Sequence, residues 1–117
     1  MPRSAAAYLA DIIEACDAIH VVLAGLDLSA YRDSRAIRSS VERELITIGE
    51  AVAVLGRVAP DVFKEISHAR MVVGFRNVLT HDYAAVDDET VFGVTRDDIP
   101  ILRSECVALL ERAEPAD

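Results

Sequence analysis

Apolar residues recur at steps of three and four along most of this chain, which is the spacing of helices that bury one face. The first stripe predicts a helix that is capped by Ser4 and runs to about Leu23. The second predicts the longest helix, capped by Asp33 or Ser34 and reaching about Arg57. The inward positions expected in these two helices are Leu9, Ile12, Ile13, Cys16, Ile19, Leu23, Ile37, Val41, Leu45, Ile48, Val52 and Leu55.

The second half of the chain predicts shorter helical segments. They are a turn at 60–66, a third helix at 69–83, a fourth stretch that is capped by Asp87 or Asp88 and reaches about Val94, and a last helix from about Asp97 or Asp98. The inward residues expected of the third and last helices are Met71, Val72, Phe75, Val78, Leu79, Ile101, Leu102, Cys106, Leu109 and Leu110. Residues 26–33 are expected to form a connector, and 114–117 a frayed tail.

Gly49 lies inside the second predicted helix, where glycine costs about 1 kcal/mol relative to alanine. We therefore expect another helix to approach closely at this position. No segment alternates apolar and polar residues in the manner of a half-buried strand. The length suits one domain covering 1–117. Together these features predict an all-α fold, an antiparallel bundle of four to five helices.

The chain is acidic, with a formal net charge of −8 from 12 Lys+Arg and 20 Asp+Glu. Such a balance argues against a protein that coats nucleic acid without regard to sequence. Lys64 is the only lysine, so nearly all cationic charge is arginine. Because arginine holds phosphate in a defined, two-pronged geometry, a small basic cleft remains compatible with the composition.

Cys16 and Cys106 lie far apart in sequence on apolar helical faces, which predicts two buried, unpaired thiols in a reducing compartment. No targeting segment is evident at the start of the chain. The longest nearly uncharged run, 18–26, is too short to span a bilayer. We therefore expect a cytoplasmic protein without a membrane association.

Side chains suited to chemistry gather near the end of the third predicted helix, at Arg76, His81 and Tyr83. A guanidinium can hold a phosphate by two hydrogen bonds, and an imidazole exchanges protons near neutral pH. At about 100° per residue, Arg76 and His81 point roughly 140° apart on a regular helix. Either the helix ends near His81 and turns the imidazole back, or two copies supply one another's missing group. Alternatively, both residues only satisfy the free carbonyls and the dipole of a helix end.

Several other kinds of site have no signature in the sequence. There is no Gly-rich phosphate loop, no H-E-x-x-H motif and no Ser-His-Asp order. His20 and His68 have no histidine partner at helical spacing. We therefore expect neither a metal site nor a cofactor.

Two ordered motifs carry a resemblance to a known family. Residues 76–83 fit R-N-x-x-x-H-x-Y, and 43–51 fit R-x-L-x-x-I-G-E-A. Both patterns are typical of the HEPN family in its HepT-like branch, and this chain is similar to that branch from about Tyr8 to about Arg112. It departs from the branch at Phe75, where methionine is common, and at Asp82, where glycine is common.

The resemblance implies a helical bundle that dimerises through the helix carrying R-x4-H-x-Y. It also implies a metal-independent ribonuclease whose substrate ribose 2′-OH attacks the phosphodiester. In that case Arg76 would stabilise the phosphate and its developing charge, and His81 would transfer a proton or position the scissile group. Asn77 would support them by hydrogen bonding. Arg43 is a candidate, with Arg38, to add positive charge at the dimer cleft.

The HepT-like branch further implies a toxin–antitoxin pair of the type VII kind. Tyr83 resembles the tyrosine to which a small partner nucleotidyltransferase, the antitoxin, transfers AMP. An anionic group there would fill the phosphate cleft and repel RNA. Two other functions remain open at this point. One is a non-catalytic HEPN module that binds a nucleotide or scaffolds the nucleotidyltransferase, and the other is a plain helical dimerisation protein.

Overall fold

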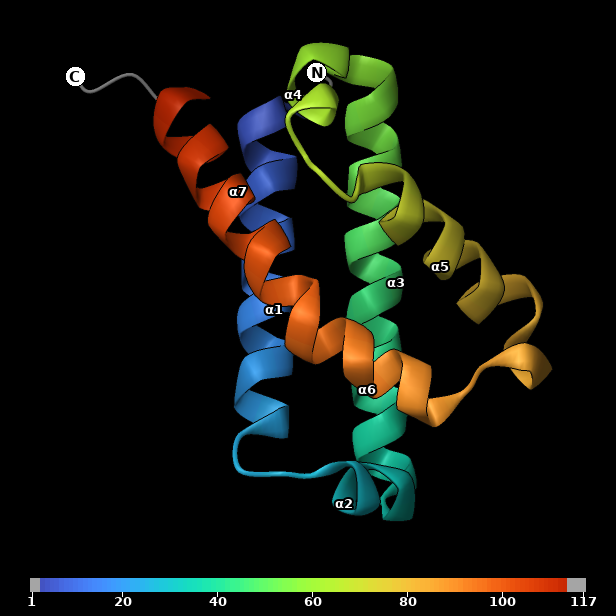
Figure 1. Ribbon diagram of the computed structural model, residues 1–117. Coiled ribbons are helices and arrows are strands. Elements are labelled where there is room, and N and C mark those ends of the chain that lie inside the picture. Colours follow the sequence, from blue (N-terminus) through green and yellow to red (C-terminus); the bar gives the residue numbers. More distant parts are fainter. Residues whose placement is uncertain (1–2, 114–117) are drawn as a thin grey trace.

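The computed structural model describes residues 3–113, which form seven α-helices and one 3₁₀ turn (Figure 1). The elements are α1 (Ala5–Leu23), α2 (Leu28–Asp33), α3 (Arg35–Val58), α4 (Pro60–Lys64), α5 (Ala69–His81), η1 (Tyr83–Ala85), α6 (Asp88–Asp97) and α7 (Ile99–Ala113). Five of these helices have ten or more residues, and no strand occurs among residues 3–113. The prediction of an all-α fold is confirmed.

Two long antiparallel helices, α1 and α3, form the centre of the bundle (Figure 1). The helix α7 packs on α1, whereas α5 packs obliquely on α3 at the other side. The short helix α6 leads from η1 into α7 and contacts α2. The largest fully buried aliphatic side chains, all from α1, α3 and α7, are Leu9, Ile12, Ile19, Ile48, Leu55 and Leu102.

Side-chain caps set the starts of four helices. The side chains of Ser4, Asp27, Ser34 and Asp87 each accept a hydrogen bond from the backbone N–H three residues later. Such a bond satisfies one of the donors that a helix start leaves free. The cap predicted at Ser4 is confirmed, and the structure selects Ser34 and Asp87 from the predicted alternatives.

The prediction of a connector at 26–33 is wrong, because 28–33 form α2. Tyr31 on this helix is fully buried, and its ring centroid lies 5.6 Å from that of Phe92. A helix of six residues has fewer than two turns, so it leaves no periodic stripe for sequence reading to detect. Its signals were the cap Asp27 and one aromatic residue.

Two other boundaries differ from the predictions. The turn predicted at 60–66 is helical only to Lys64, and the fourth stretch continues to Asp97 instead of Val94. The helix α7 then starts after a single residue, at Ile99. Its buried stripe is Ile99, Leu102, Cys106 and Leu109, so the prediction that Ile101 faces inward is wrong and its side chain is exposed.

Both cysteines are free and buried, as expected. Burial raises the pKa of each thiol to about 12, so both stay protonated at neutral pH. The tail predicted at 114–117 lies outside the described residues. Within 3–113, no helix combines the length and the apolar character needed to cross a membrane.

Candidate active site

The helix α5 buries only one side against the bundle, through Ala69, Val72 and Leu79. Its outer side carries Met71 and Val78, whose side chains are 38% and 39% exposed. The prediction that these two residues face inward is wrong. Apolar residues occupy both faces of α5, so their spacing alone could not say which face is buried. Gly74 lies between them on the outer side, where an added Cβ would meet nothing within 4 Å.

Gly49 is the point at which α5 comes closest to α3. A Cβ built on Gly49 would lie 2.2 Å from the Cβ of Arg76 and 3.3 Å from the carbonyl oxygen of Val72. Only a glycine leaves room for the first of these contacts. The close helix approach predicted at Gly49 is therefore confirmed, and the residue that fills the space is Arg76.

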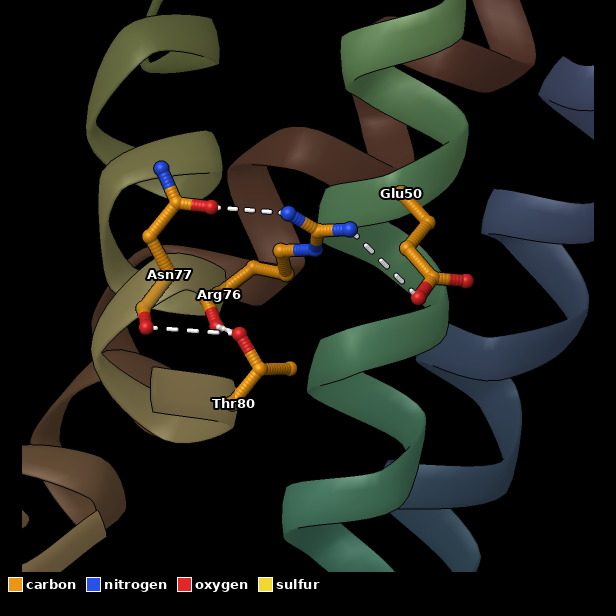
Figure 2. A network of polar contacts seen from close by, with 4 residues as sticks. All are labelled: Glu50, Arg76, Asn77 and Thr80. Atoms are coloured by element: carbon orange, nitrogen blue, oxygen red, sulfur yellow. Dashed lines mark hydrogen bonds and ion pairs between the residues drawn. The ribbon is translucent and has the colours of Figure 1, made fainter. Parts of the chain in front are cut away.

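The guanidinium of Arg76 bridges α5 and α3 (Figure 2). Its Nη1 donates to Oδ1 of Asn77 at 2.8 Å, and its Nη2 lies 3.6 Å from Oε1 of Glu50 on α3. Its Nε is buried and has no hydrogen-bond partner among the described residues. The Arg76 side chain as a whole is 27% exposed.

The bond to Asn77 changes the expected geometry of the cluster. The angle of about 140° between Arg76 and His81 describes where the two side chains start, not where they end. Asn77 and His81 are an i, i+4 pair on one face of α5, about 40° apart. The hydrogen bond therefore links Asn77, on the His81 side of α5, to a guanidinium that lies between α5 and α3.

The end of α5 differs from the prediction by two residues. The backbone N–H of Asp82 donates to the carbonyl oxygen of Val78 at 2.9 Å, which keeps the chain helical through His81. Tyr83 then begins η1. The imidazole is therefore not turned back toward Arg76 by an early helix end. Within 3–113, no hydrogen bond or ion pair joins His81 to Arg76.

His81 and Tyr83 both lie at the surface. His81 ends α5 and is exposed, and Tyr83 is 79% exposed. Thr80 lies between Asn77 and His81 in sequence. Its hydroxyl is used within α5, where it donates to the carbonyl oxygens of Arg76 and Asn77 (Figure 2). The structure thus brings Arg76, Asn77 and Glu50 together. The imidazole of His81 and the phenol of Tyr83 are exposed at the surface beyond this cluster.

The structure does not bring Arg43 into this cluster. Arg43 lies on α3 seven residues before Glu50, which places it on the same helix face about 10 Å away along the axis. Its side chain is exposed. Arg38 is engaged elsewhere, since its guanidinium donates to the carbonyl oxygen of Arg32 at the junction of α2 and α3.

Helix capping does not explain the position of Arg76, whereas His81 does lie in the last turn of α5. Arg76 bonds a side chain and a neighbouring helix, not the free carbonyls of α5. His68 lies at the opposite end of α5, where its Nδ1 is 3.0 Å from a carboxylate oxygen of Asp98. Among residues 3–113, no three His, Cys, Asp or Glu side chains gather closely enough to hold a metal ion.

Comparison with known proteins agrees with this arrangement. Residues 12–109, most of the chain, match the family described as "Ribonuclease HepT-like". The chain belongs to the HepT-like ribonuclease family. The resemblance found in the two sequence motifs is thereby confirmed, and with it a ribonuclease activity on RNA.

Relatives of this HepT-like chain occur in Methanocaldococcus jannaschii. The protein named "Putative RNase MJ1380" is 28% identical over 103 residues, covering 88% of this chain and 94% of its own length. "Putative RNase MJ1216" is 29% identical over 117 residues, covering 98% and 94% respectively. "Putative RNase MJ0125" is 29% identical over 114 residues, 96% of each chain. No solved structure matches significantly.

One residue of this HepT-like site was missed by the sequence prediction. Glu50 was quoted only as part of a long-helix pattern, yet it is the α3 side chain that faces Arg76. Its signal was available, because a residue next to a glycine at a close helix crossing lies beside the approaching helix. Locating the partner, however, required the register of α3 against α5.

Proposed function

We propose that two copies of the chain associate through the outer face of α5, so that Arg76 of one copy faces His81 of the other. The outer face itself carries this proposal. Met71, Gly74, Val78 and His81 fall within about 80° of one another on α5. Six large apolar side chains are exposed on the described chain, and three of them are Met71, Val78 and Tyr83, on or just beyond this helix. A second copy would bury that apolar stripe.

The position of Arg76 supports the same assembly. Asn77 and Glu50 hold the guanidinium between α5 and α3, and 27% of the Arg76 side chain remains exposed. An arriving second copy would therefore meet a cation that is already held in place. Because each imidazole lies on the outer face of its own helix, the same approach presents it to the partner's guanidinium. Each of the two clefts then contains Arg76 of one copy and His81 of the other.

In this cleft RNA is cleaved by its own ribose hydroxyl. His81 accepts the 2′-OH proton while the 2′-oxygen bonds to phosphorus, and the bond from phosphorus to the 5′-oxygen breaks. His81 returns the proton to the leaving 5′-oxygen, which yields a 2′,3′-cyclic phosphate and a 5′-OH. The guanidinium of Arg76 stabilises the added negative charge on the phosphoryl oxygens. The route needs no metal, because the nucleophile belongs to the substrate.

End-group analysis of the cleavage products tests the chemistry. Purified protein in EDTA should leave 2′,3′-cyclic phosphate and 5′-OH ends on a synthetic RNA. Arg76→Ala and His81→Ala should each lose about 10²-fold or more in kcat, the loss expected when a group that stabilises charge or moves a proton is removed. Arg112→Ala, which removes an exposed arginine on α7, should retain full activity. Products with a 3′-OH and a 5′-phosphate, or an active Arg76→Ala variant, would refute this mechanism.

We further propose that the ribonuclease is the toxin of a toxin–antitoxin pair, and that a small nucleotidyltransferase silences it by AMP transfer to Tyr83. The support is accessibility, since Tyr83 is 79% exposed and follows His81 by two residues. Its phenol oxygen would attack the α-phosphorus of ATP and release pyrophosphate. The resulting adenylyl group would carry negative charge beside the cleft and compete with RNA for Arg76.

Mass spectrometry of the protein co-expressed with such a nucleotidyltransferase tests the modification. An added AMP should map to Tyr83, and Tyr83→Phe should stay unmodified and toxic. Tyr8→Phe, a change of a partly buried tyrosine on α1, should still be modified and silenced. AMP on another residue, or silencing without any added mass, would contradict this regulation.

The alternative, a non-catalytic HEPN module that binds a nucleotide or scaffolds the nucleotidyltransferase, draws on one observation. Two carboxylates lie near the site, Glu50 beside Arg76 and Asp82 beside His81. They would oppose a polyanion more than a small nucleotide. Uncut RNA together with measurable ATP binding would favour this alternative over cleavage.

A further inference from the structure

Glu50 contacts the guanidinium of Arg76 across the junction of α3 and α5, and no sequence motif gave it a role (Figure 2). The separation from Nη2 to its carboxylate oxygen is 3.6 Å, and the Glu50 side chain is 56% exposed. An ion pair this long and this exposed contributes little to folding stability. Its presence beside Arg76 therefore calls for a reason other than fastening two helices together.

The contacts of Arg76 together restrict where its guanidinium can go. Gly49 lets the Cβ lie directly against α3, which fixes the start of the side chain. Asn77 holds Nη1 from one side and Glu50 attracts Nη2 from the other. An arginine has four rotatable side-chain bonds and loses much rotamer freedom when it must act in one position. Opposed contacts on its two terminal nitrogens remove part of that freedom before a substrate binds.

We propose that Glu50 is a positioning residue, which holds the guanidinium of Arg76 in the orientation that meets the scissile phosphate. The inference rests on the proposed cleavage by Arg76 and His81. Glu50 does not touch the reacting atoms. It acts through Arg76, together with Gly49, which gives that side chain its space on α3.

The charge of Glu50 makes this role distinguishable from a merely structural one. A carboxylate beside the phosphate-binding cation repels RNA while it orients that cation. Removing the charge should therefore weaken catalysis without weakening substrate binding. A residue that only supported the fold would lower stability and would not separate kcat from KM in this way.

The experiment compares Glu50→Ala and Glu50→Gln with the wild type in single-substrate cleavage kinetics. Glu50→Ala should lower kcat about tenfold, since a misplaced catalytic group costs one to two orders of magnitude. Its KM should be no higher than that of the wild type. Glu50→Gln should recover part of the lost kcat, because its amide oxygen keeps a partial negative charge facing Nη2. The urea midpoint should not change in either variant.

The chain offers a matched control in Glu65. This glutamate follows α4 directly, eleven residues before Arg76; it is 52% exposed and pairs with Arg112 of α7 at 2.9 Å. Glu65→Ala removes the same charge from a similar ion pair. It should leave both kcat and KM unchanged, which separates a local effect at Arg76 from a general effect of net charge.

The outcomes separate this inference from the mechanism beneath it. If Arg76→Ala is inactive but Glu50→Ala keeps full kcat, the positioning role is wrong and the mechanism stands. If Arg76→Ala is itself active, the proposed function fails. A fall in kcat that is accompanied by a lower urea midpoint, or a KM that rises, would also overturn the positioning role. In an Arg76→Ala background, Glu50→Ala should cause no further loss.

Discussion

The helices α1 and α5 both carry an apolar stripe, but their surroundings are very different. The helix α1 lies between α3 and α7, and five of its residues are buried. The helix α5 packs on α3 alone among the long helices, and two of its large apolar side chains, Met71 and Val78, remain exposed. Both sequences predict an amphipathic helix. The comparison shows that α5 carries an apolar face, with Met71 and Val78, that the rest of the described chain leaves exposed. This face borders the candidate active site.

The charged groups of the two helices differ in the same way. On α1, Asp17 accepts a hydrogen bond from Nε of Arg103 on α7 at 2.5 Å. This ion pair lies at the surface between two packed helices. On α5, Arg76 is held at both terminal nitrogens, yet its Nε is buried without a partner. A buried donor without an acceptor is unfavourable. The bundle therefore tolerates at Arg76 a local cost that it avoids on α1.

The largest effect is expected from a charge placed on the outer face of α5. Val78→Asp should prevent association of two copies, because a carboxylate would be buried in an apolar interface. RNA cleavage should then fall by about 10²-fold or more, as expected for loss of one catalytic group from each cleft. Light scattering and cleavage assays at the same protein concentration measure both properties.

The matched variant for this prediction is Val21→Asp, at an exposed apolar position on α1. It should leave both assembly and activity as they are in the wild type. A Val78→Asp protein that still forms a dimer and cleaves RNA would show that the outer face of α5 is not the interface.

A smaller effect is expected at the contact between α3 and α5. Gly49→Ala would push a methyl group against the Cβ of Arg76, so the helices must separate or Arg76 must move. Overpacking of this kind costs about 1–3 kcal/mol of unfolding free energy, and cleavage should fall as Arg76 shifts. Urea unfolding and kinetics check both effects.

The control for that substitution is Gly93→Ala on α6, where an added Cβ meets nothing within 4 Å. Here alanine should raise the unfolding free energy by about 0.5–1 kcal/mol through its better helix propensity. Equal effects of the two substitutions would show that the space at Gly49 does not matter.

The smallest effect concerns the core on the α1 side. Burial raises the pKa of Cys16 and Cys106 from 9.0 to about 12. Since the unfolded thiols ionise first, the unfolding free energy should be constant below pH 9 and fall as the pH rises from 9 toward 12, by about 1.4 kcal/mol per pH unit for each thiol. Urea unfolding between pH 8 and 10 should show a shallower decline for Cys106→Ala than for the wild type. Parallel declines would contradict the assignment.

The parts of the fold that sequence could predict depend on local signals. The stripes of α1 and α3, the caps Ser4 and Ser34, and the close approach at Gly49 each follow from a few neighbouring residues. The missed helix α2 has too few residues for a periodic pattern. The error at Met71 and Val78 has a different cause. Apolar residues lie on both faces of α5, and only the coordinates show which face packs on α3 and that Met71 and Val78 lie on the other.

The candidate site shows the same division. The motif named Arg76, Asn77, His81 and Tyr83 as candidates, and helix geometry correctly placed Arg76 and His81 on different faces of α5. Helix geometry gives the direction in which a long side chain starts, but not where it ends. The hydrogen bond from Arg76 to Asn77 and the contact with Glu50 could therefore be found only from the coordinates. Arg43 was expected at the cleft because of its charge, but within one chain it lies on α3 away from the cluster.

Mixing two inactive variants tests the shared active site most directly. Homodimers of Arg76→Ala and of His81→Ala should each be inactive. After subunit exchange at equal concentrations, half of the dimers are mixed, and each mixed dimer keeps one cleft with an intact Arg76 and an intact His81. Activity should then recover to about a quarter of the wild-type value, as two-fold symmetry requires. Activity that stays at the sum of the two separate variants would show that each chain carries its own site.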